Sequence, residues 1–149
     1  MKQDTKIVTA GRKDKWTNGV VNPSVTRAST VVFNTVDEMN NALKNRFKQT
    51  MVYGRRGTTT AFAFSDAMTE LEGGAGCALY PSGTAAITNA IISFVKSGDH
   101  ILMVDSAYEP TRDYCDKILA KMGVETTYYD PLIGAGIESL IKENTRIVF

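Results

Sequence analysis

The fold of this 149-residue chain is decided by the stretch Cys77-Ala-Leu-Tyr80-Pro-Ser82-Gly83-Thr84-Ala-Ala-Ile-Thr-Asn-Ala-Ile-Ile92. Its first four residues predict a short buried strand, and the Pro-Ser-Gly turn leads straight into a helix. The first helical turn has N–H groups without intrahelical partners, and the helix dipole adds about half a positive charge there. Gly83 and Thr84 can therefore donate to an anion such as a phosphate. The alternative is a helix cap that binds nothing.

After this turn, apolar strands alternate with helical patterns and short connections. The expected elements are a strand over 77–80, a helix over 84–96, a strand over 101–104, a helix over 110–122, a strand over 124–129, a helix over 136–143 and a strand over 146–149. Such alternation predicts an α/β fold with a mostly parallel sheet and helices on both faces. The strands over 101–104 and 146–149 are apolar enough to be buried on both faces.

The part before this region predicts an arm and two helices. Residues 1–34 show no sustained period, so we expect an irregular arm with a short extended piece. Thr35 and Glu38 form a capping box, which begins a helix that ends near Phe47. A second helix is expected over 61–72, with a stop at Gly73-Gly74. The apolar faces expected on these two helices consist of Val36, Met39, Leu43 and Phe47, and of Phe64, Met68 and Leu71.

Composition limits the functional classes. The chain is 43% hydrophobic with a net charge of +1, which argues against a nucleic-acid surface. The N-terminus lacks the apolar core of a secretory signal, and no apolar run is long enough to span a bilayer. Cys77 and Cys115 fit no metal or redox spacing and are expected to be free buried thiols, consistent with a reducing cytoplasm.

Four further residues, in two segments, are candidates for a site. Tyr108 follows the strand over 101–104 at its carboxyl end, where ligands bind in open α/β sheets, and its ring can cover a flat heterocycle; the alternative is simple packing. Tyr53, Arg55 and Arg56 share a basic loop that suits bidentate binding of phosphate or carboxylate; the alternative is a solvated loop.

Other sequence signals restrict the ligand. Neither a dinucleotide fingerprint nor a Walker loop is present, so a single phosphate fits better than a pyrophosphate. His100 has no partner for a metal site, and no metal is expected. Trp16 is expected to be a packing anchor of the arm.

Five segments, taken together, resemble the Cys/Met-metabolism family of pyridoxal-phosphate (PLP) enzymes. They are Tyr53-Gly-Arg55-Arg56-Gly57-Thr, Leu71-Glu-Gly73-Gly74, Pro81-Ser82-Gly83-Thr84-Ala-Ala-Ile, Ser97-Gly98-Asp99-His100 and Ala107-Tyr108-Glu-Pro110. Their order and spacing agree with the family over the whole chain. Two of these motifs differ from the more general form that the family has at the same place: Arg55-Arg56-Gly57-Thr58 and Tyr108-Glu109-Pro110-Thr111. These differences favour the β-lyase branch of the family.

The resemblance implies a fold and residue roles. The fold is the first part of the large domain of fold-type I PLP-dependent transferases, preceded by an N-terminal arm. Residues 1–57 would be the arm, helix and interface loop, and residues 58–149 an incomplete cofactor domain. Gly83 and Thr84 would bind the cofactor phosphate and Tyr108 would stack on its ring and assist proton movement. Tyr53 and Arg55 would reach the cofactor phosphate of a neighbouring chain, so a dimer or tetramer is implied. Tyr53 would have a catalytic role as well. Arg56 and Asp113 would contact the distal end of the substrate.

The implied reaction is β-elimination of L-cystathionine to homocysteine, pyruvate and ammonia. The alternatives are another family activity (cystathionine γ-synthase, cystathionine γ-lyase or methionine γ-lyase) and a non-catalytic oligomerising fragment. None of the chain's lysines fits the Schiff-base lysine of the family, which is expected beyond Phe149. We therefore expect residues 1–149 alone to be catalytically silent.

Overall fold

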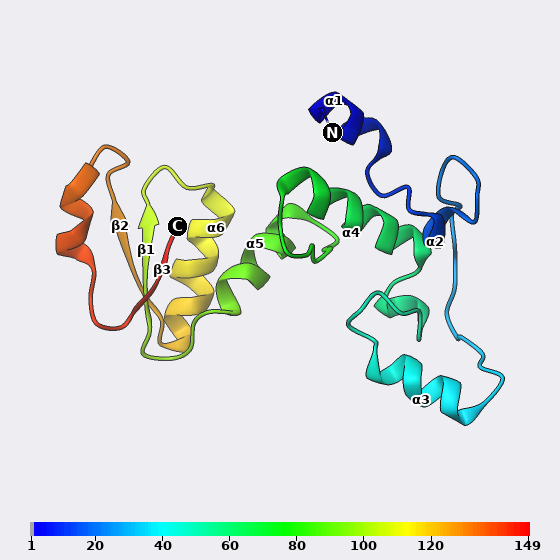
Figure 1. Cartoon of the computed structure of the whole chain (residues 1–149). Coiled ribbons are helices and arrows are strands. Elements are labelled where there is room, and N and C mark those ends of the chain that lie inside the picture. Colours follow the sequence, from blue (N-terminus) through cyan, green and yellow to red (C-terminus); the bar gives the residue numbers. More distant parts are fainter. Residues whose placement is uncertain (1) are drawn as a thin grey trace. The chain divides into compact units, whose positions relative to one another are not determined.

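The computed structural model describes residues 2–149, which form two compact units that divide between Leu79 and Tyr80 (Figure 1). The first unit contains four α-helices and a short 3-10 turn, and the second contains a parallel sheet with its helices. The division predicted from the family resemblance, into 1–57 and an incomplete cofactor domain over 58–149, stays a prediction.

The N-terminal arm contains two short helices that the sequence pattern does not reveal. They are α1 (Gln3–Thr9) and α2 (Asp14–Thr17). The prediction of a wholly irregular arm is therefore wrong. Neither helix is long enough to display a sustained 3.6-residue period. Each carries an aspartate in its first turn, where the negative charge interacts favourably with the helix dipole.

The arm is attached to α4 (Thr59–Glu72) by an aromatic contact. Trp16 of α2 packs on Phe62 of α4 with 5.4 Å between ring centroids, and both side chains are buried. Ala63 and Met51 complete this cluster. Trp16 is thus a packing anchor, as predicted.

The start of α3 (Val36–Lys44) is the predicted capping box. The Glu38 N–H donates to Thr35 Oγ1 at 3.1 Å, and the Glu38 carboxylate accepts from the backbone N–H of Asn34 at 2.9 Å. The helix ends at Lys44, three residues before the predicted end at Phe47.

The apolar faces predicted on the two helices are largely exposed within the first unit. Val36, Met39 and Leu43 of α3 are solvent-exposed, and Phe47, which lies beyond the end of the helix, is 83% exposed. On α4 the expected position Phe64 is 55% exposed, because α4 buries the side that carries Phe62, Ala63 and Ser65. The helical period identified both helices, but it did not identify the buried side of α4.

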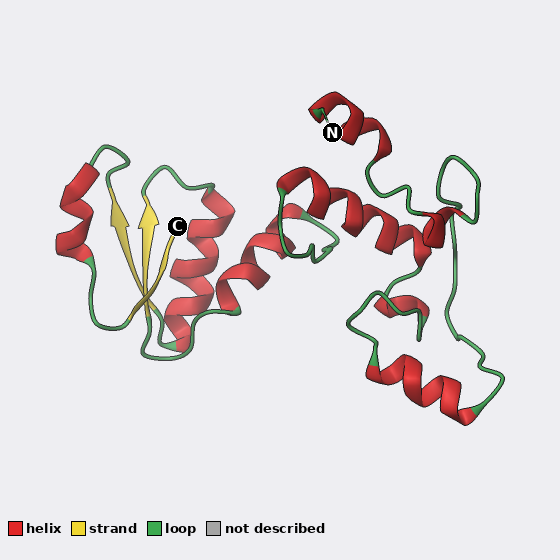
Figure 2. Cartoon of the chain, viewed as in Figure 1, coloured by secondary structure: helices red, strands yellow, loops and turns green. Residues whose placement is uncertain are grey.

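The strand predicted over Cys77–Tyr80 does not form, and these residues are loop (Figure 2). A strand requires a hydrogen-bonded neighbour, and within residues 2–149 no strand pairs with this segment. Instead the Cys77 carbonyl accepts from Ser65 Oγ at 2.7 Å. The Cys77 side chain is partly exposed rather than buried, whereas Cys115 is buried as predicted.

The second unit contains a three-stranded parallel sheet in the order β2-β1-β3. Its strands are β1 (His100–Val104), β2 (Glu125–Tyr129) and β3 (Thr145–Val148), close to the predicted positions. Only β1 is buried on both faces. The expectation of full burial is wrong for β3, where Val148 is 55% exposed, because within residues 2–149 β3 pairs on one side only.

Helical segments connect the strands. They are α5 (Gly83–Ile92) before β1, then α6 (Glu109–Tyr114) continued by a π turn (Cys115–Leu119) and a 3-10 turn (Ala120–Met122), and a 3-10 helix (Gly134–Leu140). The first is shorter than the predicted helix over 84–96, and the last replaces an expected α-helix over 136–143.

The two crossovers explain how both faces of the sheet are covered. The chain moves from β1 to one side for β2 and then across to the other side for β3. Two right-handed crossovers in opposite directions place their helices on opposite faces. Figure 1 shows α6 and the 3-10 helix over 134–140 on opposite sides of the strands.

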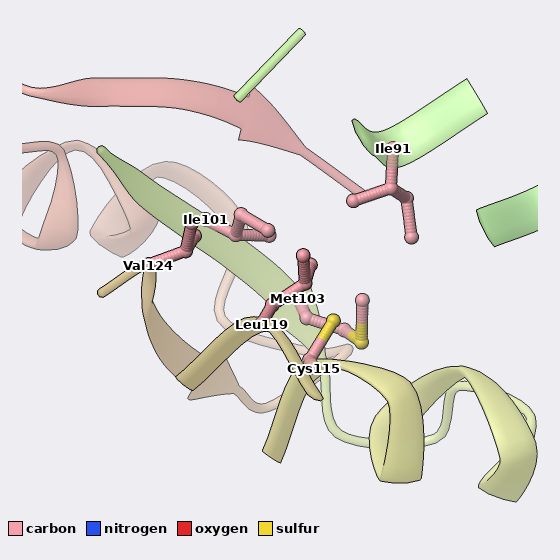
Figure 3. Close-up of a cluster of buried hydrophobic side chains, with 6 residues drawn as sticks. All are labelled: Ile91, Ile101, Met103, Cys115, Leu119 and Val124. Carbon is pink, nitrogen blue, oxygen red and sulfur yellow. The ribbon is translucent and has the colours of Figure 1, made fainter. Parts of the chain in front are cut away.

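The core of the second unit lies between β1 and the α6 side. Ile101 and Met103 of β1 pack with side chains from α5 and the turns after α6 (Figure 3). The other members are Ile91, Cys115, Leu119 and Val124, all at most 4% exposed. The alternation of Ile101 and Met103 with Leu102 follows from the two-residue period of a strand.

On the opposite face of β1, a buried histidine joins all three strands. His100 Nδ1 lies 2.8 Å from Thr145 Oγ1 of β3, and Nε2 lies 2.8 Å from Thr127 Oγ1 of β2. Because both ring nitrogens have hydroxyl partners, this polar side chain is satisfied in the core. His100 is therefore a structural residue in this unit.

Truncation of the core should cost far more than truncation of an adjacent exposed side chain. Leu119 is 1% exposed, and its neighbour Ile118 is 48% exposed. We expect Leu119→Ala to lower the free energy of unfolding by about 2–5 kcal/mol and Ile118→Ala by less than about 1 kcal/mol. Urea unfolding followed by circular dichroism measures both. Equal losses would show that Leu119 does not belong to the core.

The stability of the sheet should fall in mild acid because of His100. Burial lowers the pKa of His100 below 6.5, the charge of Lys142 acts in the same direction, and Glu125 opposes both. The unfolded chain then binds the proton more readily, so stability falls as the pH drops below about 6.5 and until it reaches the folded pKa. The stability difference between the wild type and His100→Gln should therefore narrow from pH 7.5 to pH 5 in urea unfolding. A pH-independent difference contradicts this prediction.

Candidate functional site

The N-terminus of α5 has two unused backbone donors. Ser82 is the N-cap, and its Oγ accepts from the Ala85 N–H at 3.1 Å. Within residues 2–149, the N–H groups of Gly83 and Thr84 have no hydrogen-bond acceptor. The helix is ten residues long, so its dipole adds to the attraction of an anion at this end.

Packing within the second unit does not exclude a side chain at position 83. A Cβ placed on Gly83 would meet no atom within 4 Å, and Gly83 itself is exposed. An absent side chain at an open helix N-terminus leaves the backbone accessible to a ligand. This is the arrangement that a phosphate cradle requires.

Tyr108 lies in the loop after β1, as predicted. Its side chain is 63% exposed, and its backbone carbonyl accepts from the Thr111 N–H at 2.8 Å, which begins α6. α5 leads into the start of β1 and runs opposite to it, so its N-terminus lies toward the end of the sheet where the strands finish (Figure 1). Tyr108 lies at the same end because it follows β1 and precedes α6. Open α/β sheets bind ligands at this edge.

An arginine that the sequence reasoning did not identify fixes the loop before Tyr108. Arg112 Nη1 donates to the Asp105 carbonyl at 2.7 Å and pairs with the Asp105 carboxylate at 3.0 Å. The Arg112 guanidinium also lies 4.5 Å from the ring centroid of Tyr128. The loop backbone is thereby held, while the Tyr108 ring stays free to contact a ligand.

The third candidate of this unit, Asp113, is half-buried on α6 and pairs with Lys117 at 2.7 Å. Near it, Tyr128 donates its hydroxyl to Asp116 at 2.8 Å. Burial and then this hydrogen bond raise the pKa of Tyr128 to about 12, so its phenol stays protonated. Burial also raises the pKa of the Cys115 thiol, which makes it a poor nucleophile.

The first unit carries the other candidates on one tight turn. Tyr53 is the residue before the 3-10 turn Gly54–Arg56, and the Arg55 guanidinium lies 5.7 Å from the Tyr53 ring centroid. Arg55 and Arg56 are exposed, and within residues 2–149 neither forms an ion pair. Two cations thus remain available for an anionic ligand.

Glycine is required at the start of this turn. The Gly54 N–H donates to the Ser29 carbonyl at 2.7 Å, and Thr30 forms a bridge with Tyr53. A Cβ on Gly54 would overlap the Ala28 carbonyl oxygen. The arm therefore passes directly against the turn and holds its backbone.

Beside the turn is a hollow of about 570 Å³ whose lining includes Arg46, Arg55, Arg56, Phe47 and Leu79. It combines guanidinium groups with apolar side chains within the first unit. Such a surface suits an anionic organic group rather than a metal ion. Within residues 2–149, no group of three or more His, Cys, Asp or Glu side chains could hold a metal.

A largely buried carboxylate on α4 is a second feature that the sequence reasoning missed. Asp66 accepts from Trp16 Nε1 at 2.9 Å and Gln49 Nε2 at 2.6 Å, and pairs with Lys13 at 2.7 Å. Burial alone would raise the pKa of Asp66, but the hydrogen bonds from Lys13, Trp16 and Gln49 outweigh it and lower the pKa to about 2. The available signal was Trp16 itself, because a buried indole N–H requires an acceptor.

The predicted site residues therefore fall into two sets. Gly83, Thr84, Tyr108 and Asp113 belong to the second unit, and Tyr53, Arg55 and Arg56 belong to the first. Each unit presents its own anion-binding groups. The assignment of roles to these residues stays a prediction.

Comparison with known proteins identifies the family. A family model described as Cys/Met metabolism PLP-dependent enzyme matches residues 4–149. The chain is 55% identical over 146 residues to a cystathionine beta-lyase of Salmonella typhimurium, covering 98% of this chain and 37% of that protein. It is 52% identical over 148 residues to the cystathionine beta-lyase MetC of Escherichia coli, covering 99% and 38%. The chain thus spans little more than a third of the length of these relatives.

Solved structures agree on the fold. The structure of metB from Corynebacterium glutamicum has a TM-score of 0.84 at 26% identity and covers 99% of this chain and 36% of that one. Cystathionine gamma-lyase from Lactobacillus plantarum, solved with L-serine, has a TM-score of 0.83 at 25% identity, with the same coverage.

The parallel sheet, with a helix N-terminus and an aromatic loop toward its carboxyl edge, defines the class as an α/β protein of the fold-type I PLP-dependent kind. The chain belongs to the Cys/Met-metabolism family of PLP-dependent enzymes. The family assignment confirms the predicted cofactor, pyridoxal phosphate. Among the helices of residues 2–149, none has the length and apolar character to cross a membrane.

The residues of the second unit fit this cofactor. Gly83 and Thr84 offer free N–H groups to a phosphate, the open space at Gly83 admits it, and the exposed Tyr108 ring is available for stacking. These properties come from the chain's own geometry and agree with the cofactor of the family.

Substitution of Gly83 separates a phosphate cradle from a simple helix cap. Because a Cβ at this position meets no atom within 4 Å, Gly83→Ala should leave the free energy of unfolding of the chain nearly unchanged. In the full-length protein it should weaken PLP binding by about tenfold, since the methyl group lies where the phosphate approaches. Cofactor titration by absorbance measures the affinity. Unchanged affinity would identify the turn as a cap only.

Proposed function

We propose that the full-length protein is a PLP-dependent carbon–sulfur lyase that converts L-cystathionine and water to homocysteine, pyruvate and ammonia by β-elimination. The observation that carries this proposal is the 51–55% identity to three bacterial cystathionine beta-lyases over 97–99% of the chain. We further propose a cytoplasmic homo-oligomer, a dimer or a tetramer, that acts in methionine biosynthesis.

In this proposal the second unit binds and orients the cofactor. The N–H groups of Gly83 and Thr84 donate to the phosphate at the positive end of α5. The Tyr108 ring stacks on the pyridine ring, and its hydroxyl lies near the reacting amino group, where a phenol can move a proton. Arg112 keeps the Tyr108 loop in place through Asp105. When bound, PLP supplies the electron sink that stabilises negative charge on the substrate's α-carbon.

The first unit contributes to the site of a neighbouring subunit. Arg55 binds that subunit's phosphate through its planar guanidinium, with Tyr53 beside it. Arg56, and Asp113 of the second unit, contact the distal end of the substrate. The guanidinium groups of Arg55 and Arg56 are exposed and have no ion pair among residues 2–149, which supports this role.

Residues 1–149 by themselves supply donors, a stacking ring and a cross-subunit cation. In our proposal, the lysine that binds the cofactor covalently in this family lies in the part of the full-length protein beyond Phe149. We therefore propose that residues 1–149 alone do not catalyse the reaction.

Product analysis tests the proposal. The full-length protein, loaded with PLP, should convert cystathionine to pyruvate and homocysteine, detected by mass spectrometry, and residues 1–149 alone should yield neither. Formation of cysteine and 2-oxobutanoate would instead indicate γ-elimination. Turnover of an O-acylhomoserine with a thiol donor, without cystathionine cleavage, would indicate γ-replacement. Absence of every product would favour a non-catalytic protein.

A further inference from the structure

We propose that Asp66 and Gln49 act as positioning residues for cofactor binding: their hydrogen bond fixes the segment that carries Tyr53 and Arg55 to the neighbouring subunit's phosphate. This inference rests on the phosphate role proposed for Arg55. It adds two residues whose proposed part is to position Arg55 rather than to bind the phosphate.

The Asp66 carboxylate divides its bonds between two parts of the first unit. Oδ2 accepts from Trp16 Nε1 at 2.9 Å and Lys13 Nζ at 2.7 Å, which attaches the arm to α4. Oδ1 accepts from Gln49 Nε2 at 2.6 Å, which attaches the segment that leads to the turn. The Asp66 side chain is only 10% exposed, so these charge-assisted bonds are largely protected from solvent.

Gln49 has a backbone conformation that requires such support. Its φ of +55° is left-handed, a region that residues other than glycine rarely adopt. Its side chain is bonded at both ends, since Nε2 donates to Asp66 and Oε1 accepts from Lys15 Nζ at 3.3 Å. Backbone strain of this kind persists where surrounding contacts hold it, and it is enriched at ligand-binding positions.

The segment from Gln49 to the turn is short and held at several points. Met51 packs against the Trp16 and Phe62 cluster, and Tyr53 forms a bridge with Thr30. Gln49 therefore sets the direction in which the chain enters the Tyr53–Arg56 turn. Arg55 has no ion pair within residues 2–149, and its guanidinium contacts the ring of Tyr53 on the same turn, so its position depends on the backbone of that turn.

Cofactor titration of the full-length apoprotein tests this role. Gln49→Gly is the main variant, because glycine adopts φ +55° without strain and only the side-chain bonds are lost. Asp66→Asn removes the carboxylate, and the exposed Glu70→Gln on the same helix is the matched control. The probes are PLP and pyridoxal, which lacks the phosphate.

We expect Gln49→Gly and Asp66→Asn each to weaken PLP binding by about fivefold to tenfold and to leave pyridoxal binding unchanged. In a protein that already carries Arg55→Ala, neither substitution should weaken PLP binding further. Glu70→Gln should match the wild type. A general loss of structure would instead weaken both probes and add to the Arg55→Ala effect.

The outcomes separate the two proposals. If Arg55→Ala weakens PLP binding but Gln49→Gly does not, or weakens both probes equally, the positioning role is overturned and the phosphate role of Arg55 stands. If Arg55→Ala leaves PLP binding unchanged, the phosphate role fails and the positioning role fails with it. Should Asp66→Asn not fold, Gln49→Gly decides the question alone.

Discussion

The burial of β1 between two parallel neighbours is the constraint on which the second unit depends. His100, Ile101, Leu102 and Met103 are fully buried, and both edges of β1 are hydrogen-bonded, to β2 and to β3. Parallel neighbours require crossover connections, which provide the helices that cover the sheet. The same geometry places the loop with Tyr108 at the carboxyl edge, where this class of fold binds ligands.

The first unit is organised differently, around the largely buried carboxylate of Asp66 beside a small aromatic cluster. Trp16 both packs on Phe62 and donates to Asp66, so the apolar and polar contacts hold the same pair of helices. Since the folded pKa of Asp66, about 2, is below the ordinary value, this network contributes stability above that ordinary value, and the contribution is lost as the pH falls toward 2. Much apolar surface of this unit, including α3, stays exposed.

The two sets of candidate residues differ in the kind of support they have. The donors of Gly83 and Thr84 follow from helix geometry alone and need no other residue to orient them. The side chains of Tyr108 and Arg55 are exposed, and their positions depend on Arg112 and on the Gln49 and Asp66 pair respectively. Backbone donors at a helix N-terminus therefore have a fixed direction, whereas each exposed side chain needs support from its own unit.

Features that arise from neighbouring residues could be predicted from the sequence. They are the capping box of Thr35 and Glu38, the Ser82 cap, the left-handed Gly73 and the apolar run of β1. Such features depend on a few adjacent backbone groups, so a short pattern specifies them. The motifs also carried the family assignment.

Which apolar segments are buried and which polar groups meet could be read only from the packed structure. Cys77–Tyr80 has a strand-like pattern but no paired strand within residues 2–149, and Phe64 lies on the exposed side of α4. The hydrogen-bond partners of His100, Asp66 and Arg112 lie on other elements or loops of the same unit, so they depend on how these parts pack together. Strand pairing and burial each require two segments in contact, and the pattern of one segment does not specify its partner.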